Sequence, residues 1–162
     1  MLTIAIDPGT TESAYAILDD ALKPVEMDIV PNPVLLRLIG ERPADNMAVE
    51  WIESYGMAVG REMFETVFWI GRFWEAALDA GMMPWKVTRR EVKLNLCHSA
   101  RAKDANIRQA LIDRFGPVGT KKEPGHFYGA KSHIWSAIAV GVTFADRVPF
   151  AEQDDDEPGV EA

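Results

Sequence analysis

Two acidic side chains stand at the ends of apolar segments that have the length of β-strands. Asp7 ends the run LTIAID directly before the turn residues Pro-Gly-Thr-Thr, and Glu50 lies near the end of the run NMAVEW. An ionised carboxylate at the end of a buried strand is costly unless a cation or hydrogen-bond donors lie beside it. Asp7 therefore indicates a metal site, a phosphate site or a cap of the turn, since Asp favours such turns.

The two carboxylates have one explanation if their strands are neighbours in a sheet. Acids at corresponding positions of adjacent strands converge on one spot. Oxygen clusters of this kind bind hard divalent cations such as Mg²⁺, which keeps several waters and contacts substrate phosphate oxygens. The sequence therefore predicts a divalent metal site that contains Asp7 and Glu50.

The elements that must position these acids follow from the spacing of apolar residues. Strand-like runs or alternation occur in five segments, residues 2–7, 13–18, 24–30, 46–51 and 82–88. Helical spacing of three and four occurs in four segments, residues 33–40, 60–80, 103–115 and 132–146. The last of these is rich in small residues and must pack closely on the sheet. Residues 117–131 contain three glycines and two prolines, which predicts a mobile loop.

This order of elements predicts an α/β fold. Three antiparallel strands followed by strands that alternate with helices form a mixed five-stranded sheet with helices on both faces. A chain of 162 residues is most simply one domain. We expect this domain over residues 1–148 and an acidic, disordered tail over 149–162, whose last twelve residues carry six acids and no base.

The predicted helix over 60–80 has more apolar surface than one buried face requires. Its helical stripe comprises Met63, Val67, Ile70, Trp74 and Leu78. A second set of large side chains widens this stripe, namely Phe64, Phe68, Trp69, Phe73 and Trp74. Core packing accounts for part of this surface, and a homodimer interface is the interpretation for the rest.

The charge of the chain is unevenly distributed. The net charge is −8, but residues 86–131 carry eleven Lys and Arg against four acids, a net charge of +7. Such a region is either a binding surface for nucleic-acid phosphates or a set of solvated helix faces. No apolar span is long enough to cross a membrane and no signal peptide is seen, so we expect a cytoplasmic protein that does not bind membranes. The single cysteine, Cys97, excludes an internal disulfide.

An ordered set of segments gives the chain a family resemblance. The segments are AIDPGTTESAYAIL, AVEW, GRFWEAAL, RREVKLNLCHSARAKDANIRQAL and SHIWSAIAVGV. Their order and spacing over residues 2–146 resemble the RuvC family of Holliday junction resolvases, particularly the phage-type RuvC-like endonucleases. The resemblance implies a ribonuclease H-like fold and a homodimer. It also implies paired symmetric nicks in four-way DNA junctions, with two Mg²⁺ or Mn²⁺ ions in each active site of an enzyme in a bacterial cell or phage-infected host.

The resemblance also assigns site residues. Asp7 and Glu50 correspond to metal ligands of the first and fourth strands, and His133 and Ser136 occupy the two family positions of the final helix. The spacing of three between His133 and Ser136 predicts that they share one helix face. By itself His133 would be read as a packed histidine, but the resemblance implies that it is a metal ligand. Ser136 departs from the acid usual in the family, and a hydroxyl is a poor Mg²⁺ ligand. Lys103 resembles the family's basic position near the active site.

Further residues are candidates for DNA contacts. Arg89, Arg90 and Lys93 lie at the start of a short helix, and Lys121, Lys122 and Lys131 flank the glycine-rich loop, where they can meet phosphates. Phe127 and Tyr128, together with His126, lie in that loop, where exposed aromatic rings stack on unpaired bases.

Three alternatives remain at this stage. The first alternative is a catalytically impaired protein that binds branched DNA, which Ser136 favours. The second is a phosphotransferase fragment of the actin and sugar-kinase type, whose first phosphate loop resembles DPGTTESAYAIL, although the chain lacks the length and the second phosphate loop of that fold. The third is a resemblance to the nucleases that trim ribosomal RNA precursors, which the later segments match less well.

Overall fold

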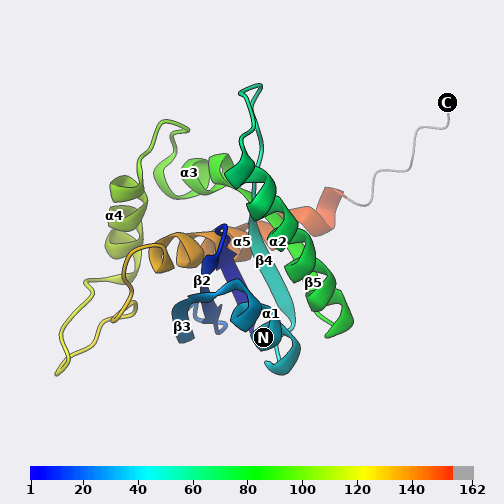
Figure 1. Cartoon of the computed structure of the whole chain (residues 1–162). Helices are drawn as coiled ribbons and strands as arrows, with labels where there is room; N and C mark the ends of the chain where they lie inside the picture. The colour runs from blue at the N-terminus through cyan, green and yellow to red at the C-terminus, as the bar shows by residue number, and fades with distance from the viewer. Residues whose placement is uncertain (155–162) are drawn as a thin grey trace.

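A single mixed sheet organises the molecule, and its strands lie in the order β3-β2-β1-β4-β5. The computed structural model describes residues 1–154, with side chains described through Arg147. The strands are β1 (Thr3–Asp7), β2 (Glu12–Leu18), β3 (Pro24–Pro31), β4 (Asn46–Trp51) and β5 (Met83–Thr88). The helices are α1 (Asn32–Glu41), α2 (Arg61–Asp79), α3 (Arg89–Cys97), α4 (Asp104–Phe115) and α5 (Ile134–Asp154). Figure 1 shows α5 crossing the sheet.

The mixed sheet predicted from the sequence is confirmed. Strands β1, β2 and β3 form an antiparallel meander, whereas β1 pairs with β4 and β4 with β5 in parallel. The short helix α3 follows β5 without a loop. Its start is defined by a capping box, in which Thr88 Oγ1 accepts from the Glu91 N–H at 3.2 Å and the Glu91 carboxylate accepts from the Thr88 N–H at 2.7 Å.

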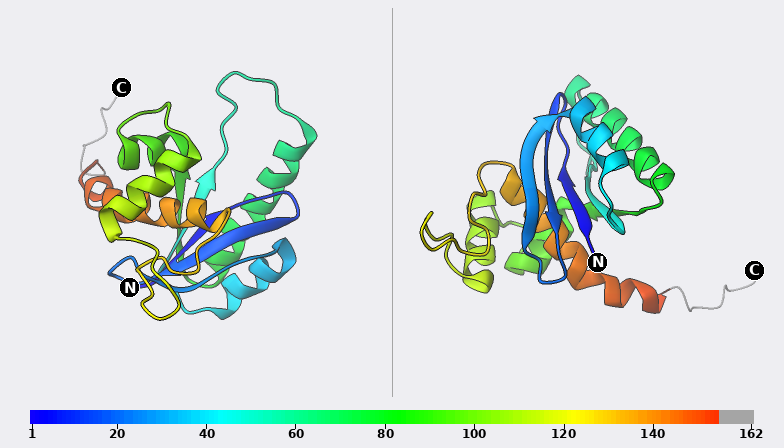
Figure 2. Two further views of the ribbon diagram at one scale, coloured as in Figure 1. Left: turned by 90° about the vertical axis from the view of Figure 1, so that its left-hand side faces the viewer. Right: turned by 90° about the horizontal axis from the view of Figure 1, so that it is seen from below.

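Helices cover both faces of the sheet, as predicted. Helices α1 and α2 pack on one face and α3, α4 and α5 on the other, which the right-hand view of Figure 2 shows edge-on. We call these the α2 face and the α5 face. Strand alternation sends Ile4 and Ile6 of β1 to the α2 face, and Ala5 to the α5 face. Each face therefore has its own hydrophobic core.

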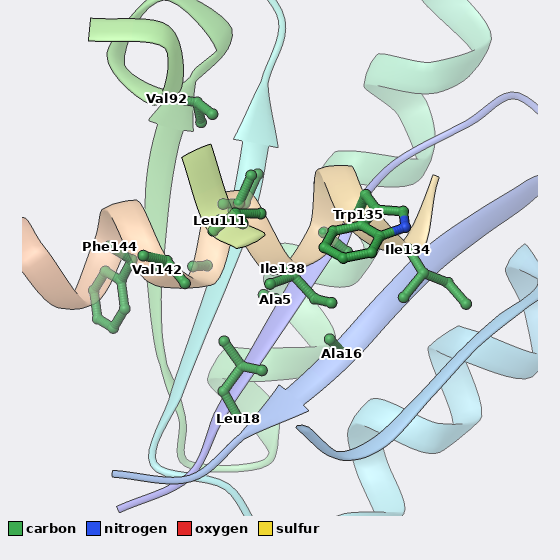
Figure 3. Packing of buried hydrophobic residues seen from close by; sticks show 14 of the residues in the cluster. Ala5, Ala16, Leu18, Val92, Leu111, Ile134, Trp135, Ile138, Val142 and Phe144 are labelled. Atoms are coloured by element: carbon green, nitrogen blue, oxygen red, sulfur yellow. The ribbon is translucent and has the colours of Figure 1, made fainter. Parts of the chain in front are cut away.

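The α5 face is built from small side chains, which lets the helix approach the strands. The sheet contributes four alanines to this contact, Ala5, Ala14, Ala16 and Ala48. At Gly141 of α5, an added Cβ would lie 2.5 Å from Leu18 Cδ1 and 2.9 Å from Ala5 Cβ. Figure 3 shows Ala5 and Ala16 of the sheet beside Ile138 of the helix. The close packing predicted for this helix is therefore present.

The buried face of α2 differs from the stripe predicted for it. The residues that α2 buries are Thr66, Ile70, Phe73 and Ala77. Val67 and Leu78 of the predicted stripe remain 46% and 48% exposed. Because apolar side chains occupy most of the circumference of this helix, spacing alone defined two overlapping stripes. Contacts with the sheet and α1 decide which stripe is buried.

The end of α5 reaches into the segment expected to be a tail. The helix continues to Asp154, so the predicted boundary at residue 149 falls within it. Residues 155–162 of the predicted disordered tail lie outside the described residues. In the described part of the chain, none of the helices has the length and apolarity needed to span a membrane.

Candidate active site

The two acids singled out in the sequence lie at the same end of neighbouring strands. In the parallel pairing of β1 with β4, Ala5 lies opposite Ala48 and Ile6 opposite Val49, so Asp7 and Glu50 are the next residues of their strands. Alternation places both side chains on the α5 face, because each follows its alanine by two positions. The predicted convergence of the two carboxylates is thus a consequence of strand register.

Burial makes the two carboxylates unusual. Only 15% of the Asp7 side chain and 16% of the Glu50 side chain are exposed. Burial, together with the nearby Asp7 charge, raises the pKa of Glu50 to about 7, although Arg89, His133 and Lys93 each lower it. Burial also raises the pKa of Asp7, against the lowering effect of His133 and Arg89. A divalent cation would relieve both charges.

His133 contacts Asp7 directly. Its Nδ1 lies 3.0 Å from Asp7 Oδ2, and 73% of its side chain is exposed. His133 is located in the turn before α5 and accepts a hydrogen bond from the Ala137 N–H through its carbonyl oxygen at 3.1 Å. It therefore precedes the helix on which the sequence had placed it, and its imidazole is a solvent-accessible partner of Asp7 rather than a packed side chain.

The turn after Asp7 does not use the Asp7 carboxylate as its cap. The Gly9 N–H donates to Ser13 Oγ at 3.1 Å, and Asn32 Nδ2 donates to the Gly9 carbonyl oxygen at 3.0 Å. Ser13 and Asn32 are joined by a buried hydrogen bond of 2.6 Å. These bonds hold the turn in place and leave the Asp7 carboxylate directed to His133.

Ser136 lines a cavity of about 370 Å³ beside this cluster, with His133 at its edge. The remaining lining residues include Arg89, Asp104, Arg108 and Trp135. The guanidinium of Arg108 lies over the Trp135 ring at 5.0 Å. The cavity thus joins the first turn of α5 to the starts of α3 and α4.

Arg89 links the acids to α4. Its Nη1 lies 3.8 Å from Glu50 Oε2, and its Nη2 forms an ion pair with Asp104 Oδ1. The sequence analysis missed Asp104. An acid at the first position of a helix is explained by the helix dipole alone, so the sequence carries no signal that connects Asp104 with Glu50.

The other basic candidates surround the site at different depths. Lys93 is half-buried and lies close enough to Glu50 to lower the pKa of that carboxyl. Lys103 is exposed, and its backbone N–H donates to Asn106 Oδ1 at the start of α4. The remaining basic candidates, Arg90, Lys121, Lys122 and Lys131, are all exposed.

The exposure predicted for one of the DNA-contact candidates is wrong. Phe127 is only 1% exposed, and its ring packs against Phe115, His126 and Trp135. The segment around it is closed by a bridge between Gly119 and Pro124, and Phe127 anchors this segment in the core of the α5 face. A composition rich in glycine and proline concealed this buried anchor. Tyr128 beside it is 41% exposed.

The residues at the end of β1 and β4 suit a hydrated divalent cation. Among the side chains that the structure describes, through Arg147, no three His, Cys, Asp or Glu residues are already grouped as a metal cage. Glu50 Oε2, however, is buried and has no hydrogen-bond partner, which is a cost that a cation would remove. Two carboxylates match an ion such as Mg²⁺ that keeps several waters, and the imidazole is a nitrogen ligand of the kind that transition metals accept.

Two solved structures of RuvC from Thermus thermophilus are similar to this chain. The first has a TM-score of 0.69 and 19% identity, and the match covers 93% of this chain and 97% of that chain. The second, RuvC in complex with a Holliday junction substrate, has a TM-score of 0.70 and 20% identity, with 93% and 96% covered. No family model and no curated protein sequence matches the chain. The chain therefore has the ribonuclease H-like fold of RuvC, which confirms the sequence resemblance at the level of the fold.

Proposed function

We propose that this chain is a metal-dependent endonuclease that cleaves branched DNA, with four-way junctions as its main substrate and residues 1–148 as the catalytic domain. One observation carries this proposal. The buried pair of Asp7 and Glu50, with His133 bound to Asp7, lies at one end of the β1–β4 pair in a chain with the RuvC fold. A buried pair of carboxylates is unfavourable for folding, and metal binding gives a reason for its presence.

Asp7, Glu50 and His133 would hold two divalent ions, Mg²⁺ or Mn²⁺. Bound there, the ions would supply an activated water and stabilise charge on the leaving oxygen. Asp7 and Glu50 contribute the negative oxygen ligands, and His133 orients Asp7 or binds an ion through its imidazole. The braced turn after Asp7 limits the movement of that carboxylate.

The basic side chains around the site would bind DNA backbone phosphates. Arg90, Lys121, Lys122 and Lys131 are exposed and available for such contacts. Lys93 lies in the middle of α3, and Lys103 directly precedes α4. Contacts of this kind orient a duplex without reading its sequence. Tyr128 is the remaining exposed aromatic candidate for stacking on unpaired bases.

The same function requires two active sites, one for each symmetric nick, and α2 offers a surface for dimerisation. Large apolar side chains of α2 and of the segment before it remain exposed, namely Tyr55, Met57, Phe64, Val67 and Phe68. Several large exposed apolar side chains on one helix and the segment before it favour an interaction surface. We propose a homodimer through this patch, with two-fold symmetry that matches the symmetry of a four-way junction.

Ser136 supports a second candidate function, which is binding of branched DNA without cleavage. Ser136 lines the cavity beside His133, at the position where the resemblance expects an acid. A neutral hydroxyl holds Mg²⁺ weakly, so the protein would protect or mark junctions rather than cut them.

Cleavage of a labelled synthetic four-way junction, beside a linear duplex of matched sequence, separates the two functions. We expect paired nicks in the junction with Mg²⁺ or Mn²⁺ and no nicks in the duplex. Asp7→Asn should abolish cleavage and keep junction binding, which is measured in the same reactions. Tight junction binding without nicks, followed by cleavage in Ser136→Asp, would select the binding function. Cleavage that survives Asp7→Asn would overturn the proposed site.

A further inference from the structure

Arg89 lies between two carboxylates that come from different parts of the chain. It is the first residue of α3, directly after β5, and 27% of its side chain is exposed. One guanidinium nitrogen lies 3.8 Å from Glu50 Oε2, and the other pairs with Asp104 at the start of α4. The ion pair with Asp104 is the closer of the two contacts.

The separation of Arg89 from Glu50 has a chemical consequence. At 3.8 Å the guanidinium does not form a hydrogen bond with the carboxylate, and Glu50 Oε2 is left buried without a partner. Guanidinium and carboxylate groups that meet freely form short, two-point hydrogen-bonded pairs. Such a pair would occupy the oxygens that a divalent cation requires.

Asp104 is positioned to prevent this closure. It begins α4, and this helix is fixed to the core of the α5 face by the buried side chains of Ile107 and Leu111. Its carboxylate is 80% exposed and pairs with Nη2 of Arg89, whereas Nη1 is the nitrogen near Glu50. A charge at the end of a firmly packed helix can therefore hold the guanidinium in one place.

We propose that Asp104 is a positioning residue that holds Arg89 away from Glu50 and thereby keeps the Glu50 carboxylate available to a divalent cation. The inference rests on the metal site of the proposed function. Arg89 acts as a resident cation that competes with the metal for Glu50. Without the Asp104 charge, the guanidinium closes on Glu50, and the metal must displace it before binding.

The test is the affinity of the full chain for Mn²⁺ in the absence of DNA, measured by electron paramagnetic resonance of free Mn²⁺. Asp104→Asn should weaken binding by about tenfold, the usual size of an effect on a metal ligand's neighbour. Arg89→Met should bind Mn²⁺ at least as tightly as the unaltered protein. In the Arg89→Met background, Asp104→Asn should have no further effect, because Asp104 acts through Arg89.

Three further variants make the test specific. Asp113→Asn removes the same charge from an exposed position of α4 and should leave Mn²⁺ affinity unchanged. Asp104→Glu should restore most of the affinity lost in Asp104→Asn. If the Arg89→Met variant is unfolded, the measurement is repeated with Arg89→Gln. Thermal unfolding of each variant shows which chains are folded.

The outcomes distinguish this inference from the function on which it rests. If Asp104→Asn weakens Mn²⁺ binding equally with and without Arg89, Asp104 acts by its own charge and the inference is wrong. The inference is also wrong if Asp104→Asn leaves Mn²⁺ affinity unchanged while Asp7→Asn removes Mn²⁺ binding. If the unaltered protein binds no Mn²⁺, or Asp7→Asn leaves binding intact, the metal site and the inference fail together.

Discussion

The two faces of the sheet differ in the size of the side chains that pack on them. On the α5 face, alanines of the strands meet Ala137, Gly141 and other small residues of the helix, so that helix and sheet come close together. On the α2 face, Ile4, Ile6 and Tyr15 meet larger side chains such as Phe73 and Leu35. The α5 face is closely packed at these small residues, whereas α2 leaves several of its large apolar side chains exposed.

The difference shows that the position of α5 relative to the strands matters most for the candidate site. Close approach of α5 brings His133, in the turn before it, to 3.0 Å from Asp7, and a displacement of the helix would separate the two. Among the described residues, α2 contributes no side chain to the contacts of Asp7, Glu50 and His133, and its outer surface carries exposed apolar side chains. Four predictions test this contrast, in order of decreasing effect.

The largest effect is expected at the exposed surface of α2. Replacing Phe64 and Phe68 together by Glu should weaken the proposed dimer by about a thousandfold, since buried aromatic side chains dominate such interfaces. Folding of the single chain should be preserved, because the two side chains are 65% and 58% exposed. Sedimentation equilibrium measures the association. Val25→Glu, at a 58% exposed position of the edge strand β3, is the control and should leave the dimer intact.

The next effect concerns the loss of stability caused by the buried, charged Glu50 side chain on the α5 face. The pKa of Glu50 rises from 4.5 to about 7 on folding, so the folded chain holds this proton more tightly than the unfolded chain. The contribution to stability is present below pH 4.5 and is lost as the pH rises toward 7. In metal-free protein at pH 8, Glu50→Gln should therefore raise the free energy of unfolding by about 3 kcal/mol.

Urea denaturation at pH 4 and pH 8 measures this effect. At pH 4 the Glu50→Gln change should not raise the free energy of unfolding, because the glutamate is then largely protonated and as neutral as the glutamine. Glu75→Gln, at an exposed position of α2, should change little at either pH. An equal gain of Glu50→Gln at both pH values would show that the buried charge is not the cause.

A smaller effect is expected from a methyl group at the closest contact of the α5 face. Gly141→Ala should lower the free energy of unfolding by about 2 kcal/mol, since overpacking a filled core costs this much. The added Cβ has Leu18 and Ala5 within 3 Å. Unfolding in urea measures the loss, and an unchanged midpoint would mean that the helix can move away from the sheet at little cost.

The smallest effect has the opposite sign and lies in α2. Nothing lies within 4 Å of a Cβ added at the exposed Gly71. Gly71→Ala should therefore raise the free energy of unfolding of the single chain by about 0.5–1 kcal/mol, the helix preference of Ala over Gly. The measurement is best made in the Phe64 and Phe68 double variant, where the proposed interface is absent. A loss of stability would contradict the contrast between the two helices.

Much of the architecture was accessible from local patterns. Alternation and apolar runs predicted the five strands, and spacing predicted four helices, because burial of one face imposes a period on the sequence. The buried stripe of α2 was predicted wrongly, since a helix that is apolar on most sides contains several stripes. Phe127 was placed on the surface for a related reason, as composition describes a segment on average and does not identify its one buried side chain.

The sequence by itself determined the strands that carry Asp7 and Glu50, the small-residue helix and the basic segment, because each depends on neighbouring residues in the chain. Only the tertiary structure decided that β1 and β4 pair in a register that brings the two acids together, that His133 reaches Asp7, and that Asp104 holds Arg89. These contacts join residues up to 126 positions apart. They depend on strand register and helix packing, which no local pattern encodes.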